Sequence, residues 1–203
     1  GANMQNTDLP LFVTYDNTDG LQAAAFTHTS FSGTGTGSIV DINTGAAASA
    51  GTSSVQAFRM RSTNTAAVLS GTITVGAAAD VGQGAGMFFA HTPNDTVTHT
   101  VTLNMGSQEG MLYVATPGGG SGVVALSGVI SGSNGLTRFG PGLLRLSGAN
   151  TFTGPLTLNS GETRLNNVSA AGLVTATGTN AININGGSLY FEASGQRYKN
   201  DLV

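Results

Sequence analysis

The sequence has no cysteine and no tryptophan, and it carries few charged residues. Only 8% of its 203 residues are Asp, Glu, Lys or Arg, against about a quarter in ordinary proteins. The absence of cysteine excludes a disulfide framework, a thiolate metal site and a thiol nucleophile. Seven basic and ten acidic residues give a net charge of −3, which leaves no basic surface for nucleic acid. So little charge also excludes a coiled coil.

Long apolar runs are also absent. No run approaches the ~18 residues of a membrane-spanning helix, and the longest apolar cluster, residues 87–90, suits a buried strand. Residues 1–10 have neither the basic region nor the apolar region of a signal peptide. We therefore expect no transmembrane segment. Gly1 and Ala2 fit either an expression scar or the start of a mature chain after cleavage.

Glycine and short alternating apolar runs are what the sequence has in quantity. It contains 31 Gly, and 39% of its residues are hydrophobic, too many for a disordered chain. Runs such as 38–42, 72–75 and 96–103 alternate apolar and polar residues between Gly, Asn or Ser, which predicts strands joined by tight turns. We expect 96–103 to be one long strand that pairs with 87–91 through a hairpin turn at Pro93–Asp95.

The second half of the sequence has a period near 20 residues. The positions 124/126, 144/146, 163/165 and 182/184 recur every 19 or 20 residues, and a second track passes through 136, 156/158, 174 and 189/191. A fixed period of this length indicates stacked units of short strands. We predict an all-β fold, a right-handed parallel β-helix. It would be one continuous domain with a less regular N-terminal β region over 1–122 and regular coils over 123–203.

The asparagine residues and the two ends of the chain indicate how such a β-helix would be stabilised. Asn150, Asn159, Asn167 and Asn185 lie at or just after strand ends, which makes them candidates for corner positions, where side-chain amides can also bond along the helix axis. The open ends of a β-helix invite pairing with other chains, and no amphipathic helix caps either end. We interpret residues 194–201 as a loop leading to a further coil, in a piece of a longer protein or a subunit whose ends neighbours cover.

Residues 131–167 carry a longer pattern of Gly, Leu, Asn and aromatic positions. The motif positions are Gly135, Leu136, Gly140, Gly142, Leu144, Leu146, Gly148, Asn150, Phe152, Gly154 and Gly161. The stretch resembles the autotransporter-associated β-strand repeat, also called the passenger-associated transport repeat. It departs from that pattern by Arg138 for Lys, Phe152 for Tyr and Pro155 for Gly. Residues 182–189 echo it weakly, and the first 120 residues do not show it.

The resemblance implies a bacterial surface or secreted β-helix protein of the type V passenger kind. The repeat has no enzymatic activity of its own and is linked to folding and transport of the passenger. The resemblance thus implies an extracellular or outer-surface location.

Three kinds of segment could be mistaken for ligand sites. His91, Asp95 and His99 are four residues apart and would share a face of an unbroken strand, but we favour two partly exposed histidines around a turn over a metal site. Residues 16–20 lack the spacing of an EF-hand and are interpreted as an Asx turn. The glycine-rich stretches 33–38, 82–86 and 118–122 are interpreted as loops, because none precedes a helix as a phosphate cradle does.

The sequence offers few residues suited to catalysis. Carbohydrate-active β-helix enzymes need clustered carboxylates, whereas ten acids are spread along this chain. Glu162 and Arg164 share a strand face, and Arg145 could stack against Arg164 from the preceding coil, which we interpret as an exposed charged ladder. We predict no enzyme, no catalytic residue, no metal and no cofactor.

Aromatic residues divide into two expected roles. The phenylalanines are mostly core candidates by alternation, and the four tyrosines could form a sugar-stacking surface. The phenylalanines in question are Phe26, Phe31, Phe58, Phe88, Phe89, Phe139, Phe152 and Phe191, and the tyrosines are Tyr15, Tyr113, Tyr190 and Tyr198.

We therefore predict a non-catalytic structural or adhesive segment of a bacterial cell-surface or secreted β-helix protein. Its expected partners are further copies, through uncapped coil ends, and a host or neighbouring-cell surface ligand or glycan. Two alternatives stay open: a self-assembling subunit of a surface layer or filament, and a carbohydrate-active β-helix enzyme.

Overall fold

The computed structural model describes residues 12–16, 20–76, 84–92, 94–117, 121–173, 180–195, 197–198 and 200–203. Gly1 and Ala2, the turn residue Pro93, residues 118–120 and Val174 lie outside the described residues. All regular secondary structure in the described part is β-strand, which confirms the all-β prediction. That part contains no helix long and apolar enough to cross a membrane.

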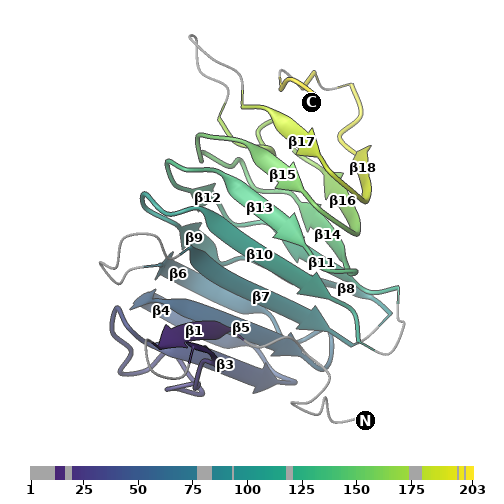
Figure 1. The fold of residues 1–203 in the computed structure, drawn as a ribbon. Helices are drawn as coiled ribbons and strands as arrows, with labels where there is room; N and C mark the ends of the chain where they lie inside the picture. The colour runs from purple at the N-terminus through teal and green to yellow at the C-terminus, as the bar shows by residue number, and fades with distance from the viewer. Residues whose placement is uncertain are drawn as a thin grey trace.

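The strands form a stack of coils with three parallel sheets along its sides (Figure 1). A seven-stranded sheet contains β3 (Ile39–Thr44), β5 (Ala57–Ser62), β7 (Ala85–His91), β10 (Gly110–Ala115), β13 (Leu136–Phe139), β15 (Leu156–Leu158) and β17 (Ile182–Ile184). A five-stranded sheet contains β8 (Thr96–His99), β11 (Val123–Leu126), β14 (Leu143–Leu146), β16 (Glu162–Leu165) and β18 (Ser188–Phe191). A four-stranded sheet contains β4 (Ala48–Val55), β6 (Leu69–Val75), β9 (Thr102–Asn104) and β12 (Ile130–Ser131).

One coil passes through the three sheets in turn, for example β10, β11 and β12, before β13 begins the next coil. Every strand of these sheets pairs in parallel with the strand one coil before or after it. This arrangement is a parallel β-helix, as predicted. Within the described residues, the first two coils supply strands only to the seven- and four-stranded sheets, and the five-stranded sheet begins at β8.

A separate antiparallel pair precedes the coils. It consists of β1 (Val13–Asp16) and β2 (Gly20–Ala23), and Figure 1 shows it in front of the N-terminal strands of the seven-stranded sheet. Residues 17–19 of the predicted Asx turn lie outside the described residues, so that prediction stays a prediction.

Alternate side chains of each strand point into the stack and align from coil to coil. One inward column of the seven-stranded sheet runs through Val40, Phe58, Met87 and Leu112, all of them buried. The ring of Phe58 also packs edge-on against Phe89, with ring centroids 5.4 Å apart. A single coil buries too few apolar side chains to hold its shape, so the stack supplies the core.

The predicted hairpin between 87–91 and 96–103 is wrong. Strand β7 pairs with β5 and β10, and β8 pairs in parallel with β11. The run 96–103 is divided between β8 and β9 by a corner at Thr100, whose N–H donates to the carbonyl oxygen of Leu69 at 3.0 Å. Alternation specifies that a segment is a strand with one buried face, but it does not specify the partner strand.

The fixed 20-residue period holds only in part. Leu136 pairs with Leu156 twenty residues later, but Leu156 pairs with Ile182 after twenty-six. The two apolar tracks therefore exchange: Ile182 belongs to the seven-stranded sheet, and Leu189 follows Thr163 in the five-stranded sheet. The longer coil includes residues 174–179, which lie outside the described residues.

Candidate functional site

The repeat-motif residues form corners and core. Gly135, Gly140, Gly154 and Gly161 have positive φ angles. The side chains of Leu136, Leu144, Leu146 and Phe152 are buried. Gly140, at φ 96°, lies at the corner between β13 and β14, where an added Cβ would come within 2.4 Å of the carbonyl oxygen of Val114. An added Cβ at Gly142 or Gly148 would likewise come within 3.0 Å of the backbone of the preceding coil. These positions shape the stack and carry no reactive group.

Asn150 supports the prediction about corner amides. Its Oδ1 accepts a hydrogen bond from the N–H of Ile130 at 2.8 Å, and its Nδ2 donates to the carbonyl oxygen of Ala170 at 2.7 Å. One side chain thus joins three successive coils. Asn185 Nδ2 donates to Asn159 Oδ1 at 2.9 Å, which is a second bond along the axis.

Asn167 differs from the other three. Its Oδ1 accepts from the N–H of Ser169, two residues away, as in a local Asx turn. The side-chain oxygen of Asn167 therefore bonds within its own corner and not along the axis.

Arg138 is the least expected buried residue. It occupies an inward position, paired with Leu112 and Leu158 in the stack, and is fully buried. Its Nη1 donates to the carbonyl oxygen of Gly140 at 2.8 Å, and its Nη2 donates to that of Gly142. Burial lowers the pKa of Arg138 to about 10. The side chain holds the corner between β13 and β14 from inside.

A charged ladder, Arg145, Glu162, Arg164 and Glu192, follows the outer face of the five-stranded sheet. Arg145 on β14 and Arg164 on β16 are register partners, so the predicted stacking is confirmed. Glu192 accepts from Arg145 Nε at 2.7 Å and from Arg164 Nη1 at 3.1 Å. Arg164 Nε also donates to Glu162. Two positive and two negative charges alternate, so the ladder is neutral overall.

The electrostatics of the ladder do not suit acid catalysis. Partial burial raises the pKa of Glu192, but hydrogen bonds from Arg145 and Arg164 outweigh it and hold the pKa below its usual value. A general acid at neutral pH needs the opposite shift. These side chains are a quarter to a third exposed, and such pairs contribute little to stability. The ladder is therefore a solvated, internally paired charged surface.

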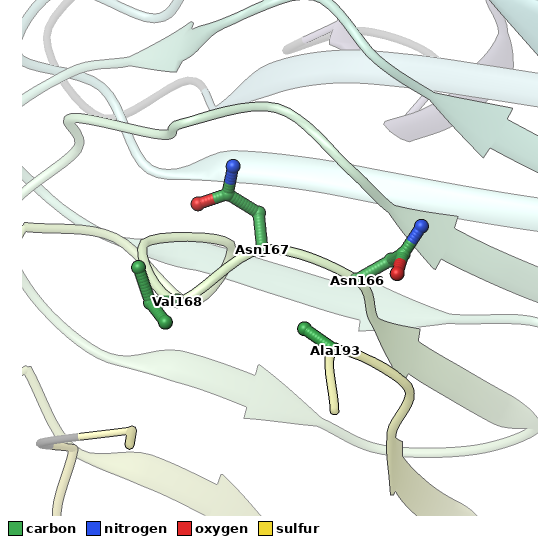
Figure 2. Close-up of a pocket in the computed structure, with 4 residues that line it drawn as sticks. All are labelled: Asn166, Asn167, Val168 and Ala193. Atoms are coloured by element: carbon green, nitrogen blue, oxygen red, sulfur yellow. The ribbon is translucent and has the colours of Figure 1, made fainter. Parts of the chain in front are cut away.

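Beside the ladder, the surface carries an exposed aromatic ring and a cavity. Tyr190 on β18 is 53% exposed, and Arg164 Cζ lies 5.9 Å from the centre of its ring. A cavity of about 160 Å³ opens just past the ends of β16 and β18. Figure 2 shows Asn166, Asn167, Val168 and Ala193 around it. Amide groups and an exposed ring beside charged side chains offer hydrogen bonding and stacking but no nucleophile.

His91 and His99 are buried, so the prediction of partly exposed side chains is wrong. His91 Nε2 is hydrogen-bonded to the carbonyl oxygen of Asp95, and His99 Nδ1 accepts from the N–H of Leu69, both at 2.9 Å. Both side chains therefore hold corners of the stack. No group of three or more His, Cys, Asp or Glu in the described part of the chain could hold a metal. Burial lowers the pKa of His99 to about 3.

Asp41 binds two arginines that the sequence did not connect with it. Arg59 and Arg61 each donate two hydrogen bonds to its carboxylate, at 2.5 to 3.1 Å. Burial raises the pKa of Asp41, but the two guanidinium groups more than offset this and lower it. Asp41 and Arg59 are register partners on β3 and β5. Asp41 and Arg59 are 18 residues apart, so a coil of 18 residues places them side by side. The period near 20 residues in the second half of the sequence did not indicate a coil of this length.

An aromatic column continues from Arg59 along the outside of the seven-stranded sheet. Phe88 stacks on Tyr113 with ring centroids 5.0 Å apart, and Tyr113 meets Phe139 edge-on at 5.2 Å. The rings cover one another, so the column is not an open sugar platform. Phe88 is buried in this outer cluster rather than in the main core.

Four of the eight phenylalanines take the predicted core positions, whereas Phe26 and Phe139 are half-buried outside the main core. Phe31, Phe58, Phe89 and Phe152 are buried in the main core. Phe191 is 47% exposed despite its inward position. Of the tyrosines, Tyr190 is the most open to a ligand, and the side chain of Tyr15 lies outside the described residues.

Half of this chain is similar to an autotransporter adhesin. The adhesin BmaC autotransporter of Brucella suis biovar 1 (strain 1330) is 36% identical over 104 residues, which are 50% of this chain and 3% of that protein. The chain thus spans only a small part of this relative's length. No family model matches the chain, and no solved structure matches it. The chain is related to part of an autotransporter adhesin.

Proposed function

We propose that the chain is a non-catalytic structural and adhesive segment of a bacterial surface or secreted β-helix protein. The similarity of half the chain to an autotransporter adhesin carries the proposal. The repeat resemblance of residues 131–167 supports a passenger of type V secretion, because its Gly and Asn positions are corners of the stack. Such a protein works outside the cell or on its outer surface.

The mechanism is that of a rod. Parallel pairing in three sheets ties each coil to its neighbours, and corner residues such as Asn150 bond along the axis. Folding can propagate from coil to coil. The outer faces then present contacts at a distance from the cell.

The proposed contact surface is the charged ladder with Tyr190 and the adjoining cavity. Arginine and carboxylate groups form directed hydrogen bonds with hydroxyl groups, and an exposed ring offers an apolar face. A surface glycan of a host or neighbouring cell fits this chemistry.

Beads coated with the chain test adhesion. We expect them to bind target cells, and we expect removal of cell-surface glycans with glycosidases to abolish binding. Arg145→Gln with Tyr190→Ala should reduce binding at least tenfold. Thr157→Ala, on the outer face of the seven-stranded sheet, is the matched control and should bind as the parent does. Undiminished binding after deglycosylation would exclude a glycan as the ligand.

A self-assembling surface-layer or filament subunit is the second candidate. It is supported by exposed apolar side chains at the C-terminal end of the stack. Negative-stain images over a concentration series test it, since fibres or sheets should appear as concentration rises. A particle that stays monomeric throughout rejects this candidate.

A further inference from the structure

The outer side of the four-stranded sheet carries no charge. Strands β4, β6, β9 and β12 contain no Asp, Glu, Lys or Arg, and Figure 1 shows them in succession along one side of the stack. The other two sheets both have charged side chains on their outer sides, Asp41 and Arg59 on one and Arg145 and Arg164 on the other. Among the described strands, the four-stranded sheet is therefore the one that presents an uncharged side to solvent.

The outward positions of this sheet are hydroxyl and amide side chains in register. Ile73, Leu103 and Ile130 point inward and are buried, so the side chains on either side of them point outward. The outward side chains form two columns along the axis, which we call the hydroxyl face: Thr52, Thr72 and Thr102 in one, and Ser54, Thr74 and Asn104 in the other. The second column continues to Ser131 on the next coil.

Most polar groups of the hydroxyl face are free to bind an outside molecule. All six of its side chains are exposed or half-buried. In the part of the chain that the structure describes, its five hydroxyl groups form no hydrogen bond. Asn104 Oδ1 accepts from the N–H of Gly106 at 2.9 Å, which leaves the Nδ2 group of Asn104 to donate outward. Since each hydroxyl both donates and accepts, the face offers both kinds of hydrogen bond.

The composition of the hydroxyl face selects the chemistry of its partner. A charged polymer would lose hydration there without meeting a counter-charge. An apolar partner would find no large hydrophobic side chain, because in the described residues all exposed ones follow residue 165. A neutral partner rich in hydroxyl groups matches the face, and the threonine methyl groups can contact the C–H groups of sugar rings.

The spacing of the hydroxyl face suits a linear chain. Neighbouring strands of a sheet are about 4.8 Å apart, and outward positions along one strand are about 6.6 Å apart. The distance from coil to coil is close to the length of one unit of a β-1,4-linked glucan, whose chain is a flat ribbon with hydroxyl groups along both edges. Because a single hydrogen bond contributes little net free energy, affinity comes from several coils that contact one polymer at once.

We propose that the hydroxyl face binds a linear, neutral β-1,4-linked glucan laid along the axis of the stack. The glucan passes Thr52, Thr72 and Thr102 in turn and exchanges hydrogen bonds with each coil. This face lies on a different sheet from the charged ladder, so the proposal does not depend on adhesion to cells. Loss of cell binding and failure of glucan binding are therefore separate results.

Depletion of the chain from solution by phosphoric-acid-swollen cellulose tests this. Thr72→Val with Thr102→Val removes two hydroxyls but keeps β-branched side chains suited to strands, and we expect at least fivefold weaker binding. Thr96→Val with Thr98→Val makes the same change at exposed positions of β8, on the five-stranded sheet, and this matched control should bind as the parent does. Binding should also persist in about 1 M NaCl, because there is no charge on the face to screen.

Soluble oligosaccharides test whether several coils act together. We expect cellohexaose to bind at least tenfold more tightly than cellobiose, because the longer chain reaches more coils. Arg145→Gln with Tyr190→Ala should leave cellohexaose binding unchanged, which separates this face from the ladder.

Several results would overturn the proposal. They are no binding of the parent chain to swollen cellulose, unchanged binding by the Thr72→Val and Thr102→Val variant, and equal weakening by the control variant. Another is an oligomer of the parent chain, seen by sedimentation, that Thr72→Val with Thr102→Val dissociates. That result would assign the face to a second copy of the chain.

Discussion

The side-chain oxygen of Asn150 accepts the backbone N–H of Ile130 at 2.8 Å, one coil before it. The same amide donates to Ala170, one coil later. Asn150 is buried, so water cannot replace either bond. A single polar side chain thus links three coils.

Replacement of Asn150 should therefore be costly. Asn150→Ala leaves the N–H of Ile130 and the carbonyl oxygen of Ala170 without partners, and each buried unsatisfied group costs about 1–3 kcal/mol. We expect the free energy of unfolding to fall by roughly 2–5 kcal/mol in urea titrations. Asn167→Ala, which loses only a local turn bond, is the control and should cost under about 1 kcal/mol. Equal losses for the two variants would contradict the axial role.

Arg138 should be more sensitive than the exposed arginines. Arg138→Ala removes the donors to Gly140 and Gly142 and opens a cavity, so we expect a loss of about 3–5 kcal/mol. Arg138→Lys should lose less, because an ammonium group still donates hydrogen bonds and fills part of the space. Arg145→Ala, on the solvated ladder, should lose under about 1 kcal/mol. Chemical denaturation of the three variants checks this order, and similar losses for Arg138→Ala and Arg145→Ala would show that Arg138 does not hold the corner.

Acid should destabilise the fold through its buried histidines. The pKa of His99 is about 3 in the folded chain, whereas an unfolded histidine titrates near 6.5. The unfolded state therefore binds a proton that the folded state does not, and stability falls as the pH drops from about 6.5 toward about 3. His99 alone contributes up to about 1.4 kcal/mol per pH unit in this window. Burial lowers the pKa of His91 as well, which acts in the same direction.

A variant separates His99 from other titrating groups. Asn offers its side-chain oxygen near the place of His Nδ1, so His99→Asn keeps an acceptor for the N–H of Leu69 but does not titrate. We expect thermal unfolding of this variant to depend less on pH between 4 and 6.5 than that of the parent. Thr157→Ala, which removes no titrating group, is the control and should keep the parent's slope. An unchanged slope for His99→Asn would refute the assignment.

The carbohydrate-active alternative has a direct assay. We expect no release of reducing sugar from a panel of polysaccharides, because guanidinium groups bind the carboxylates of Asp41, Glu162 and Glu192. Release that Glu162→Gln or Asp41→Asn abolishes would establish an enzyme.

The sequence predicted local features better than pairings. Alternation and glycine spacing located β14, β15 and β16, and the 19-residue separation of Arg145 and Arg164 placed them on adjacent coils. Alternation alone would also have placed His91 and His99 inside, since they follow the buried Phe89 and Val97 by two residues. Glu192 could not be added to the ladder, because the intervening coil is longer than the period of its neighbours.

What the sequence determined by itself is the class of fold: strands, corners and a stack, since apolar alternation and glycine placement are local properties. Only the tertiary structure decided which residues of neighbouring coils lie next to each other. Coil lengths vary at the corners, and each change moves every later side chain to a new neighbour. The Asp41 cluster, the column through Leu136, Leu156 and Ile182 and the partner of β8 all depend on that register, because backbone pairing between distant strands sets it.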